Sequence, residues 1–256
     1  MKTVKELYNF LDAKIPRSLS CEWDNDGLMV SGTLLASYNK ILLALDVTYE
    51  TVEYAVNEGY DVIISHHPLV FKGLKSINEE NFVADKAIKL IKHGVSVFSF
   101  HTRLDALCGG VNDALAEVFG LASCEPFGIE GEMIGRIGEL ETPMSAYELA
   151  KKVKQTLKCE KVTLVCPEKT VKRVCVLGGD GKDFLGAVKA FGADAYITGN
   201  MSYNTMLDAF DMGVAVIEAG HFESEEPVLS KLEEMIKEFD SDVIIGRYRS
   251  NPVKTV

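Results

Sequence analysis

Four of the five histidines in this chain lie at the ends of apolar runs, and two of them are followed by a carboxylate four residues later. Imidazole and carboxylate groups are ligands for first-row divalent metal ions. The pattern therefore predicts that the ends of strands bring metal ligands together. The candidate metal ligands are His66, His67, His101, Asp105, His221 and Glu225.

The spacing of these residues favours two metal ions. A separation of four residues places each histidine and its carboxylate on one face of a helical turn. Adjacent residues in extended backbone point to opposite sides, so His66 and His67 can reach different ions, and Pro68 favours extended backbone at the second histidine. Six donors are too many for one tetrahedral zinc ion, but they suit two ions that keep open positions.

Other interpretations of the histidines stay open at this stage. A single histidine after a strand is more often a hydrogen-bonded loop residue than a ligand, although three such segments together favour metal. One ion with two bystander histidines is a further alternative. His93 precedes Gly94 at a predicted helix end, and we interpret it as a cation near a helix C-terminus. Zinc, iron and manganese all suit mixed nitrogen and oxygen ligands.

The charge of such a site points to hydrolysis. Two divalent ions with two carboxylates leave net positive charge, which favours a bound hydroxide and an anionic substrate. Because metal ions lower the pKa of bound water toward about 7, metal-bound hydroxide can serve as the nucleophile at neutral pH. Asp24 and Glu223 are candidate proton relays, and the catalytic residues stay unassigned.

The elements that must position these ligands alternate between strand and helix. Apolar runs at residues 41–46, 62–65 and 95–100 predict strands, and helices are predicted at 49–57 and 81–92. This alternation is typical of a parallel sheet covered by helices. Ligands collect beyond the carboxyl ends of such strands, which is where the histidines lie.

The second half of the chain predicts another α/β layer. Glycines punctuate a short strand that begins near Phe127, and Ser145 with Glu148 forms a capping box that begins a helix. We expect two similar α/β lobes with mostly parallel sheets, at residues 1–126 and 127–256, and a metal site between them. Whether the last strand returns to the first sheet stays open. Further strands are predicted at 162–165, 174–177, 195–198, 214–217 and 243–245, and a last helix at 228–239.

Composition excludes several classes of protein. Of 256 residues, 47% are hydrophobic and 25% charged, which is typical of a folded chain. The formal net charge of −11 argues against nucleic acid as a partner, because lysine and arginine supply most of the affinity for phosphate backbones. No run approaches the roughly 18 apolar residues of a membrane span, and the first helix lacks the core of a signal peptide. We therefore expect a cytoplasmic protein.

The sequence carries distinctive motifs at residues 23–28, 65–73, 101–106, 109–113, 178–181, 196–199 and 220–225. Together these motifs resemble the NIF-three-like family, whose members are often labelled GTP cyclohydrolase type 2 homologues. The resemblance implies a dinuclear metal site held by the six residues given above, between two α/β lobes, in subunits that assemble into a homohexamer. The length matches the short form of the family, without its inserted domain.

Three positions depart from the family pattern. Arg103 stands where the family usually has Asn, Asn200 where Asp is usual, and Asn204 where His is frequent. All three are candidates to line the cavity, so substrate contacts are not transferred to them. The run Gly178–Gly181 is interpreted either as a phosphate cradle or as a plain tight turn, since it lacks a full nucleotide-binding pattern.

Our hypothesis from the sequence is a dinuclear metal-dependent hydrolase, with GTP cyclohydrolase-like chemistry as one form. Its substrate would be a small anionic or nucleotide-like molecule. The alternative is a metal-binding regulatory or partner-docking protein without turnover, because ligands alone do not establish catalysis. An open metal position that faces a cavity is needed by the hydrolase and absent from a closed structural site. The sequence leaves open the substrate, the metal and the bridging ligand.

Overall fold

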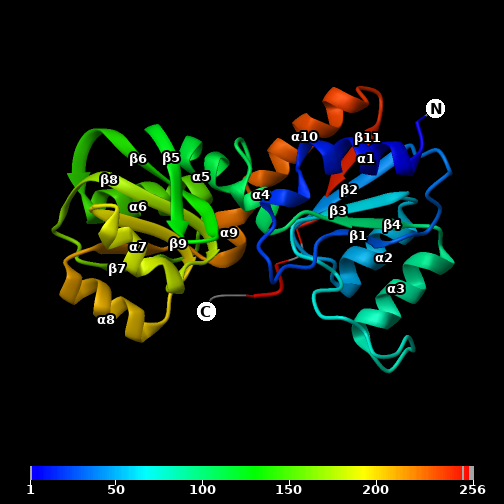
Figure 1. Cartoon of the computed structure of the whole chain (residues 1–256), viewed down its shortest axis with the longest axis horizontal. Helices are drawn as coiled ribbons and strands as arrows, with labels where there is room; N and C mark the ends of the chain where they lie inside the picture. Colours follow the sequence, from blue (N-terminus) through cyan, green and yellow to red (C-terminus); the bar gives the residue numbers. More distant parts are fainter. Residues whose placement is uncertain (1, 250, 254–256) are drawn as a thin grey trace. The chain divides into compact units, whose positions relative to one another are not determined.

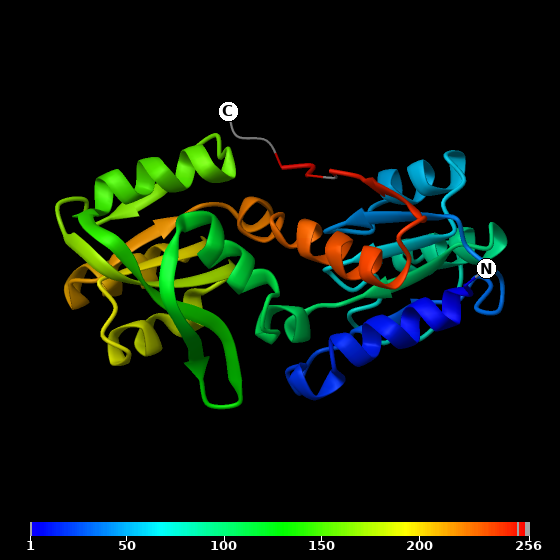
Figure 2. The ribbon, with the colours of Figure 1, turned by 90° about the horizontal axis from the view of Figure 1, so that it is seen from above.

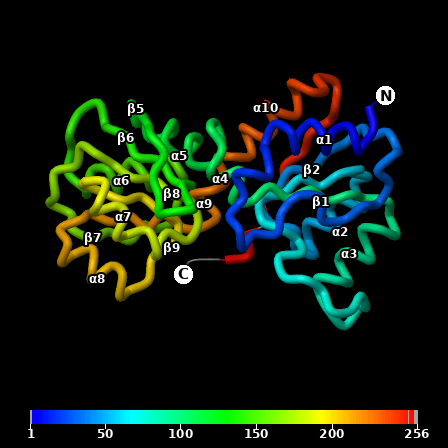
Figure 3. Tube along the Cα trace, in the orientation of Figure 1, coloured from blue at the N-terminus to red at the C-terminus, as the bar shows by residue number. Residues whose placement is uncertain are grey.

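The computed structural model describes residues 2–249 and 251–253 (Figure 1). Contacts divide the chain into two compact units. The first unit combines the chain up to Leu104 with Leu229–Pro252, and the second contains Asp105–Val228. The chain passes from one unit to the other inside helix α4 (Thr102–Ala106) and again inside α10 (Val228–Phe239), a path that can be followed in Figure 3.

The first unit is built on a sheet of strand order β1-β4-β3-β2-β11. Only β1 runs antiparallel to its neighbour, and β11 pairs in parallel with β2, so the last strand does return to the first sheet. Helices α1 and α10 lie on one face and α2 and α3 on the other (Figures 1 and 2). The elements are α1 (Val4–Lys14), η1 (Arg17–Leu19), β1 (Gly27–Val30), β2 (Lys40–Ala44), α2 (Tyr49–Asn57), β3 (Val62–Ser65), α3 (Phe82–Lys92), β4 (Ser96–Ser99) and β11 (Ile244–Arg247).

The second unit has a sheet of order β5-β6-β8-β9-β10-β7, in which β8, β9 and β10 are parallel and the flanking pairs antiparallel. Helices α5 and α6 pack their apolar side chains on one face, and α7 and α8 lie on the other. The elements are α5 (Val111–Phe119), β5 (Leu121–Ile129), β6 (Glu132–Ser145), α6 (Ala146–Leu157), β7 (Thr163–Val165), β8 (Thr170–Asp180), η2 (Lys182–Phe184), α7 (Leu185–Ala190), β9 (Ala195–Asn200), α8 (Tyr203–Met212), β10 (Ala215–Glu218) and α9 (His221–Glu225).

The predicted α/β class with mostly parallel sheets is confirmed, and both sheets also contain antiparallel strands. The region around residue 126 differs from expectation. Where a short glycine-punctuated strand was predicted, the chain forms the long hairpin of β5 and β6, and residue 126 lies inside β5. Gly135 lies within β6, where a Cβ would collide with the ring of Phe127. This glycine therefore permits close packing and does not end the strand. The units meet in sequence at Leu104, some twenty residues before the predicted boundary.

Among the described residues, no helix combines the length and apolar character needed to cross a membrane.

Candidate metal centre

Three of the predicted ligands form a histidine cluster in the first unit, consisting of His66, His67 and His101. The adjacent parallel strands β3 and β4 end in register, with Ser65 opposite Ser99, so the residues that follow them share one edge of the sheet. The ring centroids of the histidine cluster are 4.9, 5.3 and 5.7 Å apart. One nitrogen of each ring lies within 4.8 Å of a nitrogen of the other two.

Each ring of the histidine cluster is held through its Nδ1 atom. Nδ1 of His66 lies 2.9 Å from the carbonyl oxygen of Phe100. Nδ1 of His67 lies 2.9 Å from a carboxylate oxygen of Asp46, and Nδ1 of His101 lies 2.9 Å from one of Asp24. Because carbonyl and carboxylate oxygens accept, Nδ1 carries the proton and Nε2 is the nitrogen that would bind a metal. This is the arrangement that orients metal-binding histidines in proteins.

The carboxylate of Asp24 accepts hydrogen bonds from two residues. Besides His101, it accepts hydrogen bonds from the amide and hydroxyl of Thr102, at 3.0 and 2.6 Å, and so satisfies the first turn of α4. Burial raises the pKa of Asp24, but the hydrogen bonds from His101 and Thr102 prevail and lower it to about 2. A carboxylate with a lowered pKa stays charged at neutral pH and serves as an acceptor for His101 and Thr102, while its role as a proton relay stays a prediction.

Asp105 is placed by the same short helix. It lies four residues after His101, in α4, and is only 7% exposed. Within the second unit the buried side chain of Asn112 lies 3.5 Å from the carbonyl oxygen of Asp105 and 2.8 Å from that of Ile134. The other end of this amide accepts from the backbone of Gly178 at 2.8 Å. Asn112 therefore links α4 to the glycine run at the end of β8.

The predicted pair of the second unit is formed at the start of α9. Nε2 of His221 lies 3.3 Å from a carboxylate oxygen of Glu225, the spacing of one helical turn. On its other side, Nδ1 of His221 lies 3.1 Å from the side-chain amide of Asn200. Ser224 donates to the carbonyl oxygen of His221 at 2.9 Å and thereby closes the first turn of α9. Glu225 is buried and His221 partly exposed.

The run Gly178–Gly181 packs against this pair, and the amides of its three glycines donate within the protein. The amide of Gly178 donates to Asn112, that of Gly179 to Ser224 at 3.1 Å, and that of Gly181 to the carbonyl of Asn200 at 3.2 Å. These donors are therefore already engaged. Gly179 has a φ of +72°, and a Cβ there would collide with the carboxylate of Glu225. Glycine is needed because the strand end approaches the candidate ligands closely.

The positions that depart from the family pattern have different roles. The guanidinium of Arg103 is fully buried, donates to Asp26 at 3.0 Å and Asp12 at 2.7 Å, and so does not line a cavity. Asn200 contacts His221, whereas Asn204 is exposed on the first turn of α8. His93 is the C-cap of α3, with Nδ1 2.8 Å from the carbonyl oxygen of Lys89, which agrees with its interpretation as a residue at a helix C-terminus.

The structure thus brings together three predicted ligands in the first unit and two in the second, with Asp105 on the helix that connects the units. That all six meet around two ions stays a prediction. Sequence reasoning did not assign Asp46 and Asn112 to the site. Asp46 could have been found, because it is the last residue of a predicted strand that runs parallel to the neighbouring strand of the histidine cluster. Asn112 is a helix residue without a strand-end signal, although it lies in the motif at residues 109–113.

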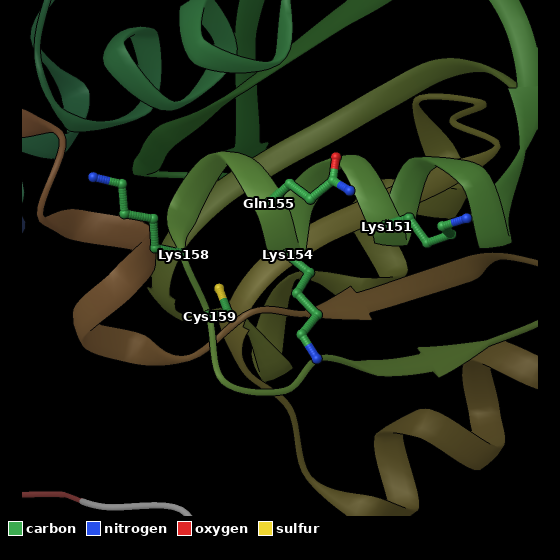
Figure 4. Close-up of a pocket in the computed structure, with 5 residues that line it drawn as sticks. All are labelled: Lys151, Lys154, Gln155, Lys158 and Cys159. Atoms are coloured by element: carbon green, nitrogen blue, oxygen red, sulfur yellow. The ribbon is translucent and has the colours of Figure 1, made fainter.

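A hollow of about 400 Å³ lies elsewhere in the second unit, at the C-terminal end of α6 (Figure 4). Its lysine amines point in different directions, so they do not converge on one anion. Burial raises the pKa of the Cys159 thiol to about 11, which makes it a poor nucleophile and metal ligand at neutral pH. The hollow is lined by Lys151, Lys154, Gln155, Lys158 and Cys159.

Comparison with known proteins gives matches along the whole chain. The model of the Duf34/NIF3 (NGG1p interacting factor 3) family matches residues 2–252. A Clostridium perfringens protein named GTP cyclohydrolase 1 type 2 homolog is 34% identical over 261 residues, with 99% of each chain covered. A Schizosaccharomyces pombe protein named Protein NIF3 homolog is 30% identical over 277 residues, covering 100% of this chain and 96% of that protein.

Solved structures share the fold. A Bacillus cereus protein related to NIF3 superimposes with a TM-score of 0.88 at 24% identity, and 100% of both chains is covered. Reduced HcgD from Methanocaldococcus jannaschii gives a TM-score of 0.82 at 27% identity, covering 96% of this chain and 97% of that one. Both similarities extend over the first and second units.

Proposed function

From the premise that this chain belongs to the Duf34/NIF3 family, we propose that it is a dinuclear metal-dependent hydrolase acting on a small anionic molecule. The observation that carries the proposal is the histidine cluster, in which three imidazoles have Nδ1 fixed by oxygen acceptors and a ring nitrogen turned toward the others. Three imidazoles that each bring one ring nitrogen within 4.8 Å of the other two are arranged as ligands of one ion would be. The donor set fits a divalent ion.

Candidate ligands of both units lie close in sequence to the points where the chain passes from one unit to the other. His101 and Asp105 are separated by one turn of α4, the helix within which the chain enters the second unit. The chain returns after Val228, three residues beyond Glu225. Both passages therefore lie next to candidate ligands, and short covalent tethers favour ligands that act together.

Each part of the site has a task in hydrolysis. When bound, two divalent ions supply Lewis-acid polarisation and a water of lowered pKa. Asp24 and Asp46 keep two of the imidazoles in the tautomer that presents Nε2, and Asn200 orients His221. Asp105 and Glu225 supply the carboxylates. The name GTP cyclohydrolase 1 type 2 homolog, given to relatives, suggests a nucleotide-like substrate.

A second candidate is a metal-binding partner protein without turnover. The family description, NGG1p interacting factor 3, names a protein partner for a member of the family. In that case the ions would stabilise a docking surface. The homohexamer expected from the resemblance and the cytoplasmic location expected from the composition also belong to the proposed function. Native mass measurement of the purified protein checks the homohexamer.

The test combines elemental analysis with an activity screen on the same preparations. We expect about two zinc, iron or manganese ions per wild-type chain, and fewer in His101→Ala and in His221→Ala. His93→Ala is the matched control, since it removes a histidine at the end of α3 and should keep full occupancy. Full occupancy in both ligand variants would refute the site. Occupied metal without turnover of nucleotides, phosphoesters or cyclic amides would favour the partner protein.

A further inference from the structure

Two exposed aromatic rings lie beside the histidine cluster in the first unit. Trp23 is 54% exposed and Phe71 is 43% exposed. Their ring centroids are 6.2 Å apart with an interplanar angle of 72°, and each ring is 6.1 Å from that of His101. Single exposed apolar side chains are common, whereas adjacent exposed rings that border polar residues are typical of ligand-binding surfaces. We call this pair the aromatic corner.

The loops that carry the aromatic corner are fixed. Asp24 follows Trp23, and its fully buried side chain accepts a hydrogen bond from His101. The side-chain amide of Asn25 donates to the carbonyl oxygen of Val70 at 2.5 Å, which ties the first loop to the residue before Phe71. Because the neighbours of both rings are anchored, the rings are held at the surface by the fold. A preformed surface of this kind loses little entropy when it binds a ligand.

We propose that the aromatic corner binds a planar aromatic ring of the substrate, an inference that rests on the proposed function. Rings set at 72° offer the face of one and the edge of the other, and a planar ligand can stack on the first and meet the second edge-to-face. The corner adjoins His101, so a ring held there places its substituents at the histidine cluster. The ligand class is a planar heteroaromatic compound with an anionic group, such as a purine nucleotide.

Binding can be read directly, because Trp23 is the only tryptophan of the sequence. Zinc-loaded and zinc-free protein would be titrated with guanosine monophosphate and, separately, with ribose phosphate, which has the sugar and phosphate but no ring. Excitation at the red edge of tryptophan absorption avoids the purine. We expect saturable quenching of Trp23 by the nucleotide and none by ribose phosphate.

The decisive comparison uses Phe71→Leu, which keeps the reporter and removes half of the corner. Stacking on a protein aromatic ring is worth enough that its loss should weaken nucleotide binding about tenfold, or 1.4 kcal/mol. Phe82→Leu is the matched control, because it removes another exposed ring of the same unit, on α3, and should leave binding unchanged.

Three outcomes overturn the inference. The first is equal binding of guanosine monophosphate and ribose phosphate. The second is nucleotide binding that Phe71→Leu leaves unchanged. The third is a Trp23 emission that changes with protein concentration but not with the nucleotide. The last would mean that a second copy of the chain covers the corner. Zinc content measured on the same preparations separates the two proposals. If the protein holds zinc but binds both probes equally, only the proposal for the aromatic corner is refuted. If the protein holds no metal, the proposed function is refuted. In that case the Phe71→Leu comparison still tests whether the aromatic corner binds the nucleotide.

Discussion

Replacing Asp24 with Asn tests how strongly the acceptor behind a histidine controls metal affinity. The carboxylate accepts from Nδ1 of His101 and from the amide and hydroxyl of Thr102, at 2.9, 3.0 and 2.6 Å. An asparagine of the same shape has one acceptor oxygen and an NH₂ group that would face a donor. His101 then loses the partner that fixes its tautomer, and we expect zinc affinity to fall 10- to 100-fold, about 1.4 to 2.7 kcal/mol.

The same substitution should lower the stability of the metal-free protein. A hydrogen bond to a charged group contributes about 1.5–3 kcal/mol. The pKa of about 2 for Asp24, against an ordinary 3.8, corresponds to a similar value of about 2 kcal/mol. Since the folded-state pKa is lowered, this contribution is present above about pH 4 and is lost as the pH falls toward 2. The stability difference between wild type and variant should shrink over that range.

Zinc affinity would be measured by competition with a chromophoric chelator, and stability by denaturant unfolding of the metal-free protein. Glu22→Gln is the matched control, because it removes a carboxylate from an exposed position of the same loop and should leave both quantities unchanged. A variant at Asp24 that loses stability but binds zinc within about twofold of wild type would refute the reasoning. The carboxylate would then only satisfy the first turn of α4.

Three further substitutions probe other parts of the molecule. Asn200→Asp places a carboxylate against Nδ1 of His221, and we expect about tenfold tighter metal binding in chelator competition, because a charged acceptor raises the basicity of the ring. Gly179→Ala places a methyl group against the carboxylate of Glu225, at a position whose φ is +72°. Metal content should therefore fall while far-ultraviolet circular dichroism stays near wild type. Arg103→Met leaves Asp26 buried without its ion pair and should reduce the free energy of unfolding by about 3–5 kcal/mol in denaturant titrations.

Local sequence patterns predicted the elements that carry the histidine cluster. The predicted bounds of α2 and β3 agree with the structure, because both segments have clear apolar periodicity and a glycine between them. The hairpin of β5 and β6 was underestimated, because its glycines were interpreted as breaks, whereas Gly135 makes room for the ring of Phe127. Propensity alone does not reveal which glycines a partner requires.

The candidate ligands were predictable, but their supporting groups were predictable only in part. Spacing from strand ends identifies residues that the backbone itself brings together. Asp24 reaches His101 from 77 positions away in the sequence, and its task as acceptor follows from that contact. The position of Asp46 at the end of β2 gives the one signal that local reasoning could have used.

The run Trp23-Asp24-Asn25 couples the two proposals, because neighbouring residues serve different tasks. Asp24 orients a histidine, while Asn25 ties its loop to Val70 beside Phe71. Asn25→Ala should therefore loosen the aromatic corner and weaken nucleotide binding several-fold without changing zinc content. Asp24→Asn should weaken both zinc binding and nucleotide binding, since it also releases the loop that carries Trp23. If the Ala variant instead lost zinc and kept nucleotide binding, the loop would support the metal ligands alone, and the aromatic corner would not depend on the contact between the loops.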